Sequence, residues 1–262
     1  EQAVTEHSDA QIIINATPVG MFPKQDGRPI DISAFPKLEG VIDAIYNPLR
    51  TNLILDAQER GIPAEGGLYM LSAQAVHASA VFRDIPLDES LVDKAFKSVK
   101  NDKQSIVLIG MPSSGKTTVG RILAEKCGKQ LADTDEYIVR KIGMPISDFF
   151  AKHGEAEFRK IEKETVAELS ATGGRIIATG GGAGLDAENV RALKQNGVLV
   201  FLDRRPENLI ATDDRPLASR RSALEKLYAE RYDIYCAAAE LHIDANTTPE
   251  AEADAILKEL AK

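Results

Sequence analysis

Residues 105–118 of the chain read SIVLIGMPSSGKTT. The first six of them form a continuous apolar run, as expected for a strand that is buried on both faces of a sheet. Residues 110–117 fit the pattern G-x-x-x-x-G-K-[ST] without a mismatch, and a helical segment from Lys116 to about Cys127 follows. A strand, a glycine-rich turn and a helix in this order predict a loop that binds phosphate groups.

The spacing of this motif has a physical reason. Glycines allow the backbone to curl so that its N–H groups point inward around phosphate oxygens, at the positive end of the following helix. Lys116 is expected to reach the transferred phosphoryl group, and the Thr117 hydroxyl to hold Mg²⁺. The residues expected to bind ATP here are Gly110, Ser113, Ser114, Gly115, Lys116, Thr117 and Thr118. The alternative, a chance glycine-rich turn, is disfavoured by the flanking strand and helix.

Apolar runs alternate with helical periods on both sides of the motif. After it, strands are expected at 130–133, 175–179, 198–202 and 241–244. The alternation predicts an α/β fold of the P-loop kinase type, in which helices flank a parallel sheet.

The composition narrows the classes of function. The 262 residues, 44% of them hydrophobic, suggest two modest domains. A net charge of -8 argues against a broad surface for nucleic acid or acidic membranes, so neither is expected as a partner. Two cysteines, no apolar run of spanning length and no charged-then-apolar leader predict a cytoplasmic protein. The chain begins in mid-pattern at Glu1, and we expect it to belong to something longer.

Two carboxylates, Asp133 and Asp135, lie at the end of the strand expected at 130–133. On a strand both point the same way, towards the carboxyl edge of the sheet, where ligands of open α/β sheets bind. One is expected to serve the metal ion and the other a substrate hydroxyl. A helix cap is the alternative for either carboxylate.

Four further motifs follow in the second part of the chain. They are FRKIE at 158–162, GGG at 180–182, RPL at 215–217 and ERY at 230–232. Together with the phosphate loop and the paired aspartates, these motifs resemble the shikimate kinase family, through nearly the whole of the chain after residue 104.

The resemblance implies a role for each matching residue. Asp133 matches the family's metal-associated aspartate, and Asp135 the aspartate that binds the shikimate hydroxyls and accepts a proton. Arg159 and Arg231 match the arginines that hold the shikimate carboxylate, a task suited to the planar guanidinium group.

The resemblance also covers three loops. Gly181 and Gly182 lie in the glycine loop that approaches the sugar-like ring, and residues 243–249 resemble the family's adenine-side loop. Arg215 matches the catalytic arginine of the mobile lid, which closes over the phosphates of ATP. Segment 212–221 departs from the family pattern through two aspartates before this arginine and two further arginines after it.

Each of these residues also has a plain structural interpretation. Arg159 and Glu162 have the i, i+3 spacing of a surface ion pair on a helix. Arg231 could be a solvated helix residue, and 180–182 only a tight turn. As a set these interpretations lose force, because all of them would have to hold at once in one chain.

The expected reaction is the phosphorylation of the 3-hydroxyl of shikimate by ATP and Mg²⁺. The transition state of phosphoryl transfer is loose, so positioning and charge neutralisation matter more than a strong base. The alternatives are a related P-loop kinase, for instance of the gluconate kinase type, and a non-catalytic nucleotide-binding module.

The first part of the chain also alternates strands and helices. Short strands are expected at 11–15, 40–46 and 63–65, and helices at 52–60 and 68–82. Motifs in it resemble the C-terminal part of shikimate dehydrogenase: NATPVGM at 15–21, YNPL at 46–49 and GGLYML at 66–71. The resemblance places Thr17 and Met70 near the cofactor and makes Gln74 a substrate-binding glutamine.

Departures from that family decide what the first part is expected to do. No G-x-G-x-x-G follows a strand, and the family's catalytic domain is absent, so NADP is not expected to bind productively. The predicted organisation is a truncated dehydrogenase segment at 1–85, a linker at 86–103 and a shikimate kinase domain at 104–262. The hypothesis for segment 1–85 is that it folds poorly alone, or covers an apolar face by docking on the kinase or on another copy.

Overall fold

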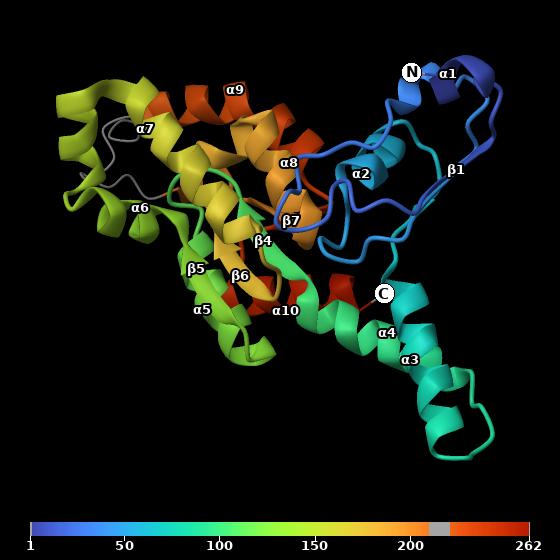
Figure 1. Ribbon diagram of the computed structural model, residues 1–262. Coiled ribbons are helices and arrows are strands. Elements are labelled where there is room, and N and C mark those ends of the chain that lie inside the picture. The colour runs from blue at the N-terminus through green and yellow to red at the C-terminus, as the bar shows by residue number, and fades with distance from the viewer. Residues whose placement is uncertain (1, 210–220, 262) are drawn as a thin grey trace. The chain divides into compact units, whose positions relative to one another are not determined.

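The computed structural model describes residues 2–209 and 221–261 of the chain. It divides into two compact units, Glu1–Gln104 and Ser105–Lys262 (Figure 1). None of the helices within the described ranges combines the length and the apolar character that a bilayer crossing requires.

A five-stranded parallel sheet forms the centre of the second unit. Its strands are β4 (Ser105–Ile109), β5 (Gln130–Asp133), β6 (Arg175–Ala178), β7 (Gly197–Asp203) and β8 (Leu241–Asp244). Their order is β5-β6-β4-β7-β8, and every neighbouring pair is parallel. The predictions of a parallel α/β sheet, and of a buried strand in the apolar run 105–110, are confirmed.

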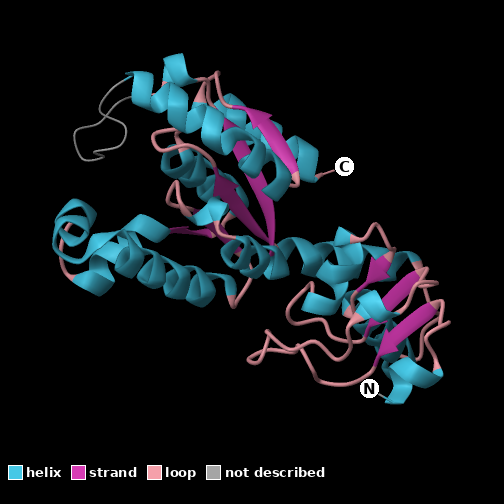
Figure 2. Cartoon of the chain, turned by 90° about the horizontal axis from the view of Figure 1, so that it is seen from above, coloured by secondary structure: helices cyan, strands magenta, loops and turns pink. Residues whose placement is uncertain are grey.

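Helices cover both faces of this sheet (Figure 2). In chain order they are α5 (Lys116–Cys127), α6 (Thr134–Ile142), α7 (Ile146–Ser170), α8 (Ala187–Asn196), α9 (Arg221–Ala238) and α10 (Pro249–Leu260), with short 3-10 turns η2 (Ala183–Leu185) and η3 (Pro206–Asn208). Gly154, whose φ of 80° is in the left-handed region, interrupts α7.

Alternate residues of the buried strands belong to two separate apolar cores. On β4, Val107 and Ile109 lie in the core that includes residues of α7, α8 and α9, and Ile106 and Leu108 lie in the core with α5 and α10. All five residues of β4 are buried, because both faces of a central strand are covered.

The parallel arrangement decides where a site can form. Because all five strands run in one direction, their carboxyl ends meet at one edge of the sheet. The loops after β4, β5, β6, β7 and β8 therefore converge there, and they contain most of the residues that the sequence analysis selected.

The first unit contains a smaller parallel sheet of order β1-β2-β3. Its elements are α1 (Gln2–Glu6), β1 (Ile12–Asn15), η1 (Ile32–Ala34), β2 (Gly40–Asp43), α2 (Asn52–Glu59), β3 (Ala64–Glu65), α3 (Leu68–Phe82) and α4 (Ser90–Lys103). One face of this sheet packs on α2 and η1, where Leu53, Ile54 and Ala57 are fully buried.

The carboxyl ends of β1 and β2 are joined by buried hydrogen bonds. Asn15 donates to Asp43 Oδ1 at 3.0 Å, and Thr51 donates to Asp43 Oδ2 at 2.6 Å. Thr17, Met70 and Gln74, which the sequence resemblance selected, are exposed.

The opposite face of the small sheet exposes apolar side chains. Ile14 and Ile42 are partners in the register of β1 and β2, and both are exposed, as is Ile12. If this unit folds poorly alone, amide hydrogens in residues 10–80 will exchange much faster than those of the second unit's sheet in a dilute sample. Equally slow exchange in both units would contradict that version of the hypothesis.

The stretch 86–103, expected to be a linker, is mostly the 14-residue helix α4. This helix packs against α3: Val92 is buried, and the rings of Tyr69 and Phe96 meet edge to face with centroids 5.4 Å apart. Apolar positions on one face of α4 give it a helical partner, which the high charge of the segment obscured in the sequence.

Candidate active site

The loop between β4 and α5 has a backbone conformation that depends on its glycines. Gly110 and Gly115 have φ angles of 143° and 92°, and a Cβ on Gly110 would lie 2.8 Å from the carbonyl oxygen of Leu202. Side chains are rarely tolerated in such conformations, so the glycines fix the shape of the loop. Gly115 immediately precedes α5, whose positive end the loop surrounds.

Lys116 lies folded over this loop. Its Nζ donates hydrogen bonds to the carbonyl oxygens of Gly110 at 3.0 Å and Met111 at 2.7 Å, and the residue is only 6% exposed. Ser114 is fully buried beneath it. The loop thus carries a localised positive charge within a chain whose net charge is negative.

Asp133 connects the end of β5 with the start of α5. Its Oδ2 accepts a 2.6 Å hydrogen bond from Thr117 Oγ1, and its Oδ1 accepts bonds from the backbone N–H groups of Asp135 and Glu136. Asp133 is therefore the N-cap of α6, as the alternative interpretation allowed. The two aspartates do not share a strand, because Asp135 lies in the first turn of α6.

The Thr117 and Asp133 oxygens suit a magnesium ion. Mg²⁺ takes hard oxygen ligands and is usually held by one or two protein oxygens together with substrate phosphates and water. A hydroxyl and a carboxylate oxygen 2.6 Å apart at the mouth of a phosphate loop match this donor set. In the described part of the chain, no cluster of three or more His, Cys, Asp or Glu side chains offers another metal site.

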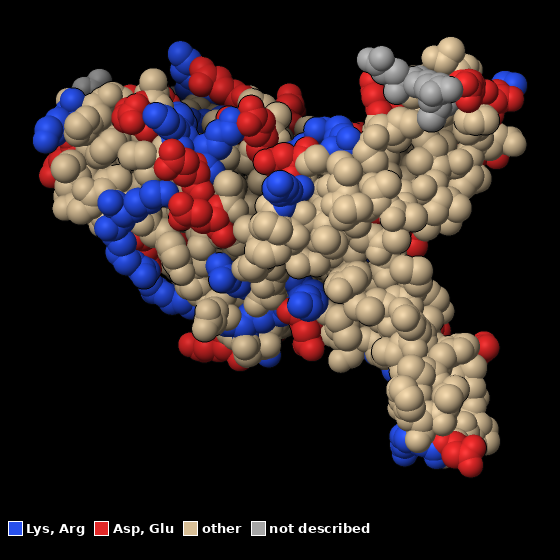
Figure 3. Space-filling model, viewed as in Figure 1, with Lys and Arg blue, Asp and Glu red and all other residues tan. Residues whose placement is uncertain are grey.

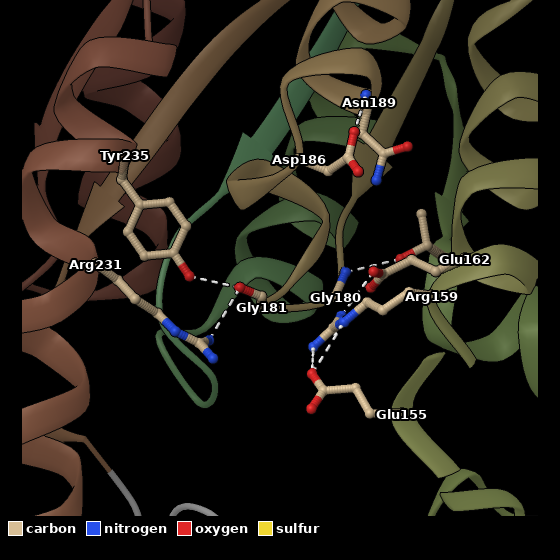
Figure 4. Close-up of polar contacts among 10 residues, drawn as sticks. Glu155, Arg159, Glu162, Gly180, Gly181, Asp186, Asn189, Arg231 and Tyr235 are labelled. Atoms are coloured by element: carbon tan, nitrogen blue, oxygen red, sulfur yellow. Dashed lines mark hydrogen bonds and ion pairs between the residues drawn. The ribbon is translucent and has the colours of Figure 1, made fainter. Parts of the chain in front are cut away.

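Arg159 on α7 is held by two carboxylates. Its Nη1 donates to Glu162 Oε2 at 2.7 Å, and its Nη2 donates to Glu155 Oε1 at 3.0 Å (Figure 4). Glu162 is only 2% exposed, so the pair is not the solvated surface pair that the spacing alone suggested. A Cβ on Gly182 would lie 1.8 Å from Arg159 Nη1, so the guanidinium lies directly against the glycine loop.

The glycine loop after β6 is held from several sides. Gly180 N–H donates to Thr134 Oγ1 at 2.7 Å, and a Cβ on Gly180 would lie 2.5 Å from Asp135 Oδ1. The carbonyl oxygen of Gly181 accepts hydrogen bonds from Arg231 Nη1 at 3.2 Å and Tyr235 Oη at 2.5 Å.

Figure 4 shows the resulting arrangement: Arg159 and Glu162 reach the loop from α7, and Arg231 and Tyr235 reach it from α9 on the opposite side. Two guanidinium groups and the Asp135 carboxylate therefore surround one glycine loop. On the face drawn in Figure 3, Lys and Arg side chains of the second unit are interspersed with Asp and Glu, so an anionic ligand depends on such a local cluster.

The cluster of Asp135, Arg159 and Arg231 around the glycine loop adjoins the phosphate loop. A Cβ on Gly181 would lie 2.8 Å from Cγ of Pro112, which belongs to the loop after β4. The structure thus brings together the selected residues of β4–α5, α6, α7, the glycine loop and α9. Arg215 lies outside the described residues.

A sequence model of the shikimate kinase family matches residues 112–261. The chain belongs to the shikimate kinase family. It is 40% identical to the shikimate kinase of Moorella thermoacetica (strain ATCC 39073 / JCM 9320) over 161 residues, which cover 60% of this chain and 91% of that protein.

One solved structure of a shikimate kinase supports this assignment. A shikimate kinase from Acinetobacter baumannii in complex with shikimate is 34% identical, with a TM-score of 0.59 over 63% of this chain and 96% of that one. A chorismate mutase/shikimate 5-dehydrogenase fusion protein from Clostridium acetobutylicum is 38% identical, with a TM-score of 0.35 over 37% of this chain and 36% of that one.

Sequence reasoning missed two residues that shape this shikimate kinase site. Tyr235 is fully buried and lies one helical turn after Arg231, so both side chains reach Gly181 from the same face of α9. Thr134 is fully buried and bonds Gly180. The i, i+4 spacing was a usable signal for Tyr235, whereas nothing local to the sequence marks Thr134.

Glu162 makes the stability of the second unit depend on pH. Burial raises the pKa of this carboxyl above its usual value of 4.5; Arg159 opposes the shift, and Asp135 and Asp186 add to it. Because the folded state binds the proton more tightly, this stabilising contribution is complete below pH 4.5 and is lost as pH rises through the raised pKa.

Glu162→Gln is therefore expected to flatten the fall of the unfolding temperature with pH in that window. Calorimetry of wild type and variant at several pH values measures this dependence. The unfolding transition of the second unit is recognised as the one whose temperature rises when Mg-ADP is added. Glu155→Gln is the matched control, since it removes an exposed carboxylate that pairs with the same guanidinium. Parallel profiles for wild type and Glu162→Gln would contradict the prediction.

Gly182→Ala should act on the acceptor through Arg159. The new methyl group overlaps the guanidinium, which is the flexible end of a side chain, so we expect Arg159 to move while the fold is kept. If Arg159 binds the carboxylate of shikimate, loss of one charged hydrogen bond from it should raise KM for shikimate by about tenfold to a hundredfold. Affinity for Mg-ADP should not change.

A double-mutant cycle with Arg159→Met tests this route. If Gly182→Ala acts by displacing the guanidinium, it should add little to the effect of Arg159→Met. Fully additive losses would show that the glycine acts independently of Arg159.

Proposed function

We propose that the second unit transfers the γ-phosphoryl group of ATP to the 3-hydroxyl of shikimate, giving shikimate 3-phosphate and ADP. The observation that carries the proposal is the contact between Gly181 and Pro112. It sets a cluster of one carboxylate and two guanidinium groups beside a phosphate-binding loop. Such an arrangement suits a donor phosphate and a carboxylated polyol ring bound side by side.

The β4–α5 loop takes the nucleotide in this proposal. Backbone N–H groups of the loop, the side chains of Ser113, Ser114 and Thr118, and the positive end of α5 hold the phosphate oxygens. Lys116 exchanges its loop carbonyls for phosphoryl oxygens. Thr117 and Asp133 would hold Mg²⁺, which, when bound, neutralises charge on the phosphates.

The acceptor lies against the glycine loop. Arg159 and Arg231 bind the carboxylate of shikimate, Asp135 orients its hydroxyls, and the loop of Gly181 and Gly182 approaches the ring. Asp135 also accepts the proton of the attacking hydroxyl as the new P–O bond forms. Arg215, which lies outside the described residues, is proposed to add positive charge at the γ-phosphoryl group.

Coupled measurement of ADP release tests the proposal. Mg-ATP is supplied with shikimate, with quinate or with gluconate. Turnover that requires shikimate supports the proposed acceptor, whereas turnover with gluconate alone would indicate the related kinase alternative. Binding of Mg-ATP with no acceptor-dependent turnover would leave a nucleotide-binding module.

For the first unit we propose no dehydrogenase activity. It contains a three-stranded sheet and no glycine-rich dinucleotide loop within its described residues. Shikimate-dependent reduction of NADP by the whole chain, above that of the assay blank, would overturn this proposal.

A further inference from the structure

Arg204 lies beside the phosphate loop at the carboxyl end of β7. A Cβ on Gly115 would be 3.5 Å from Arg204 Nη2 and 3.9 Å from its Cζ. The same Nη2 donates a 2.9 Å hydrogen bond to Glu252 Oε1 on α10. The guanidinium group therefore lies between the phosphate loop and the first turn of α10.

Glu252 is a buried charge with an unusual environment. It is only 1% exposed. Its Oε2 and the Nε of Arg204 are buried without a hydrogen-bond partner among the described residues. Burial raises the pKa of this carboxyl, while Arg204 and the backbone N–H of Thr247 act in the opposite direction. Such incompletely satisfied groups are costly in a folded protein and call for an explanation.

A second set of bonds links the same two loops. Asn246 Oδ1 accepts hydrogen bonds from the backbone N–H of Arg205 at 3.0 Å and from Asn208 Nδ2 at 2.8 Å. Its Nδ2 donates to the carbonyl oxygen of Asp203 at 3.3 Å. The β8–α10 loop is thus fastened to the end of β7 by Asn246 and again by the Arg204–Glu252 pair.

The charge of the pair indicates which part of a nucleotide it serves. Glu252 neutralises Arg204, so the pair adds no net positive charge beside the phosphate loop, where backbone N–H groups and Lys116 already serve the phosphates. A guanidinium group held by its edge still offers a flat face, and flat guanidinium faces stack on nucleobases. The pair therefore suits the nucleoside end of the ligand better than its phosphates.

We propose that Arg204 is a specificity-determining residue that binds the nucleoside part of the nucleotide, and that Glu252 is the positioning residue that holds it beside the phosphate loop. This inference rests on the nucleotide site of the proposed function. It does not depend on the identity of the acceptor.

Calorimetric titration without an acceptor tests the proposal, using Mg-ADP and magnesium tripolyphosphate as probes. Arg204→Met should weaken binding of Mg-ADP by about tenfold or more, the size of one lost stacking contact. Binding of tripolyphosphate should stay within about twofold of wild type, because the phosphates lie in the unchanged loop. Equal weakening of both probes, or of neither, would overturn the proposal.

Glu252→Gln should weaken Mg-ADP binding in the same direction, and should raise KM for ATP by a larger factor than KM for shikimate. A purely structural role would instead weaken the binding of nucleotide and of shikimate to a similar degree, reduce kcat, and lower the unfolding temperature. Asp254→Asn is the matched control: it removes another ion-paired carboxylate of α10, bonded to Lys126 and largely exposed.

The double variant Arg204→Met/Glu252→Gln guards against unfolding, since it leaves neither charge buried alone. It should reproduce the selective loss of Mg-ADP affinity, and wild-type affinity in this variant would refute the inference. Loss of shikimate-dependent turnover in the wild type would count against the proposed function alone. The titrations would still decide the role of Arg204.

Discussion

Lys116→Met is expected to lower kcat for shikimate-dependent ADP release by at least about two to three orders of magnitude. Lys116, the first residue of α5, is buried over the β4–α5 loop and bonds two loop carbonyls. In a loose phosphoryl-transfer transition state, negative charge is spread over the three equatorial oxygens of the transferred group and builds up on the leaving oxygen of ADP. A fixed cation in this water-poor site stabilises that charge far more than one in solvent.

Lys126→Met is the matched control for this variant. It removes a cation from the last turn of the same helix, where the ammonium group is partly exposed and pairs with Asp254. We expect wild-type kcat in the control and similar unfolding temperatures in both variants. Retention of kcat within about tenfold in a folded Lys116→Met would remove the lysine from the proposed transition state.

Local patterns in the sequence were sufficient for the elements around the site. The apolar run 105–110 became β4, and α5 and β5 have the bounds that the sequence indicated. The order β5-β6-β4-β7-β8 was not predictable in this way, because the partner of a strand depends on contacts between segments far apart in the chain. The charge of segment 86–103 likewise concealed helix α4.

Some residues of the candidate site can likewise be identified from local sequence patterns, and others only from contacts in the structure. Spacing in the sequence is enough to identify the loop glycines, Lys116 and the paired aspartates, because backbone geometry and phosphate chemistry restrict those positions. Arg204 and Glu252 are 48 residues apart, and only the structure joins them. For Arg159 and Glu162 the sequence did indicate a pair, but the spacing fits a surface pair equally well, and burial alone decides between the two interpretations.

Asp135→Asn is expected to lower kcat/KM for shikimate by about two to four orders of magnitude. The change keeps the size of the side chain beside Gly180 but removes its charge and its ability to accept a proton. Binding of Mg-ADP should be unchanged, because the β4–α5 loop is not altered. Asp133→Asn is the matched comparison and should instead raise the Mg²⁺ concentration needed for half-maximal rate, since Asp133 bonds Thr117.

The pH profile then separates the two tasks proposed for Asp135. If the carboxylate accepts the proton, the acidic limb of kcat should disappear in Asp135→Asn, and the residual rate should be nearly independent of pH. If it only orients the hydroxyls, the variant should keep the limb and lose a constant factor at every pH. A loose transition state tolerates a weak base, so we expect orientation to account for the larger share of the loss. Wild-type kcat/KM in Asp135→Asn would exclude both tasks and move the acceptor away from the glycine loop.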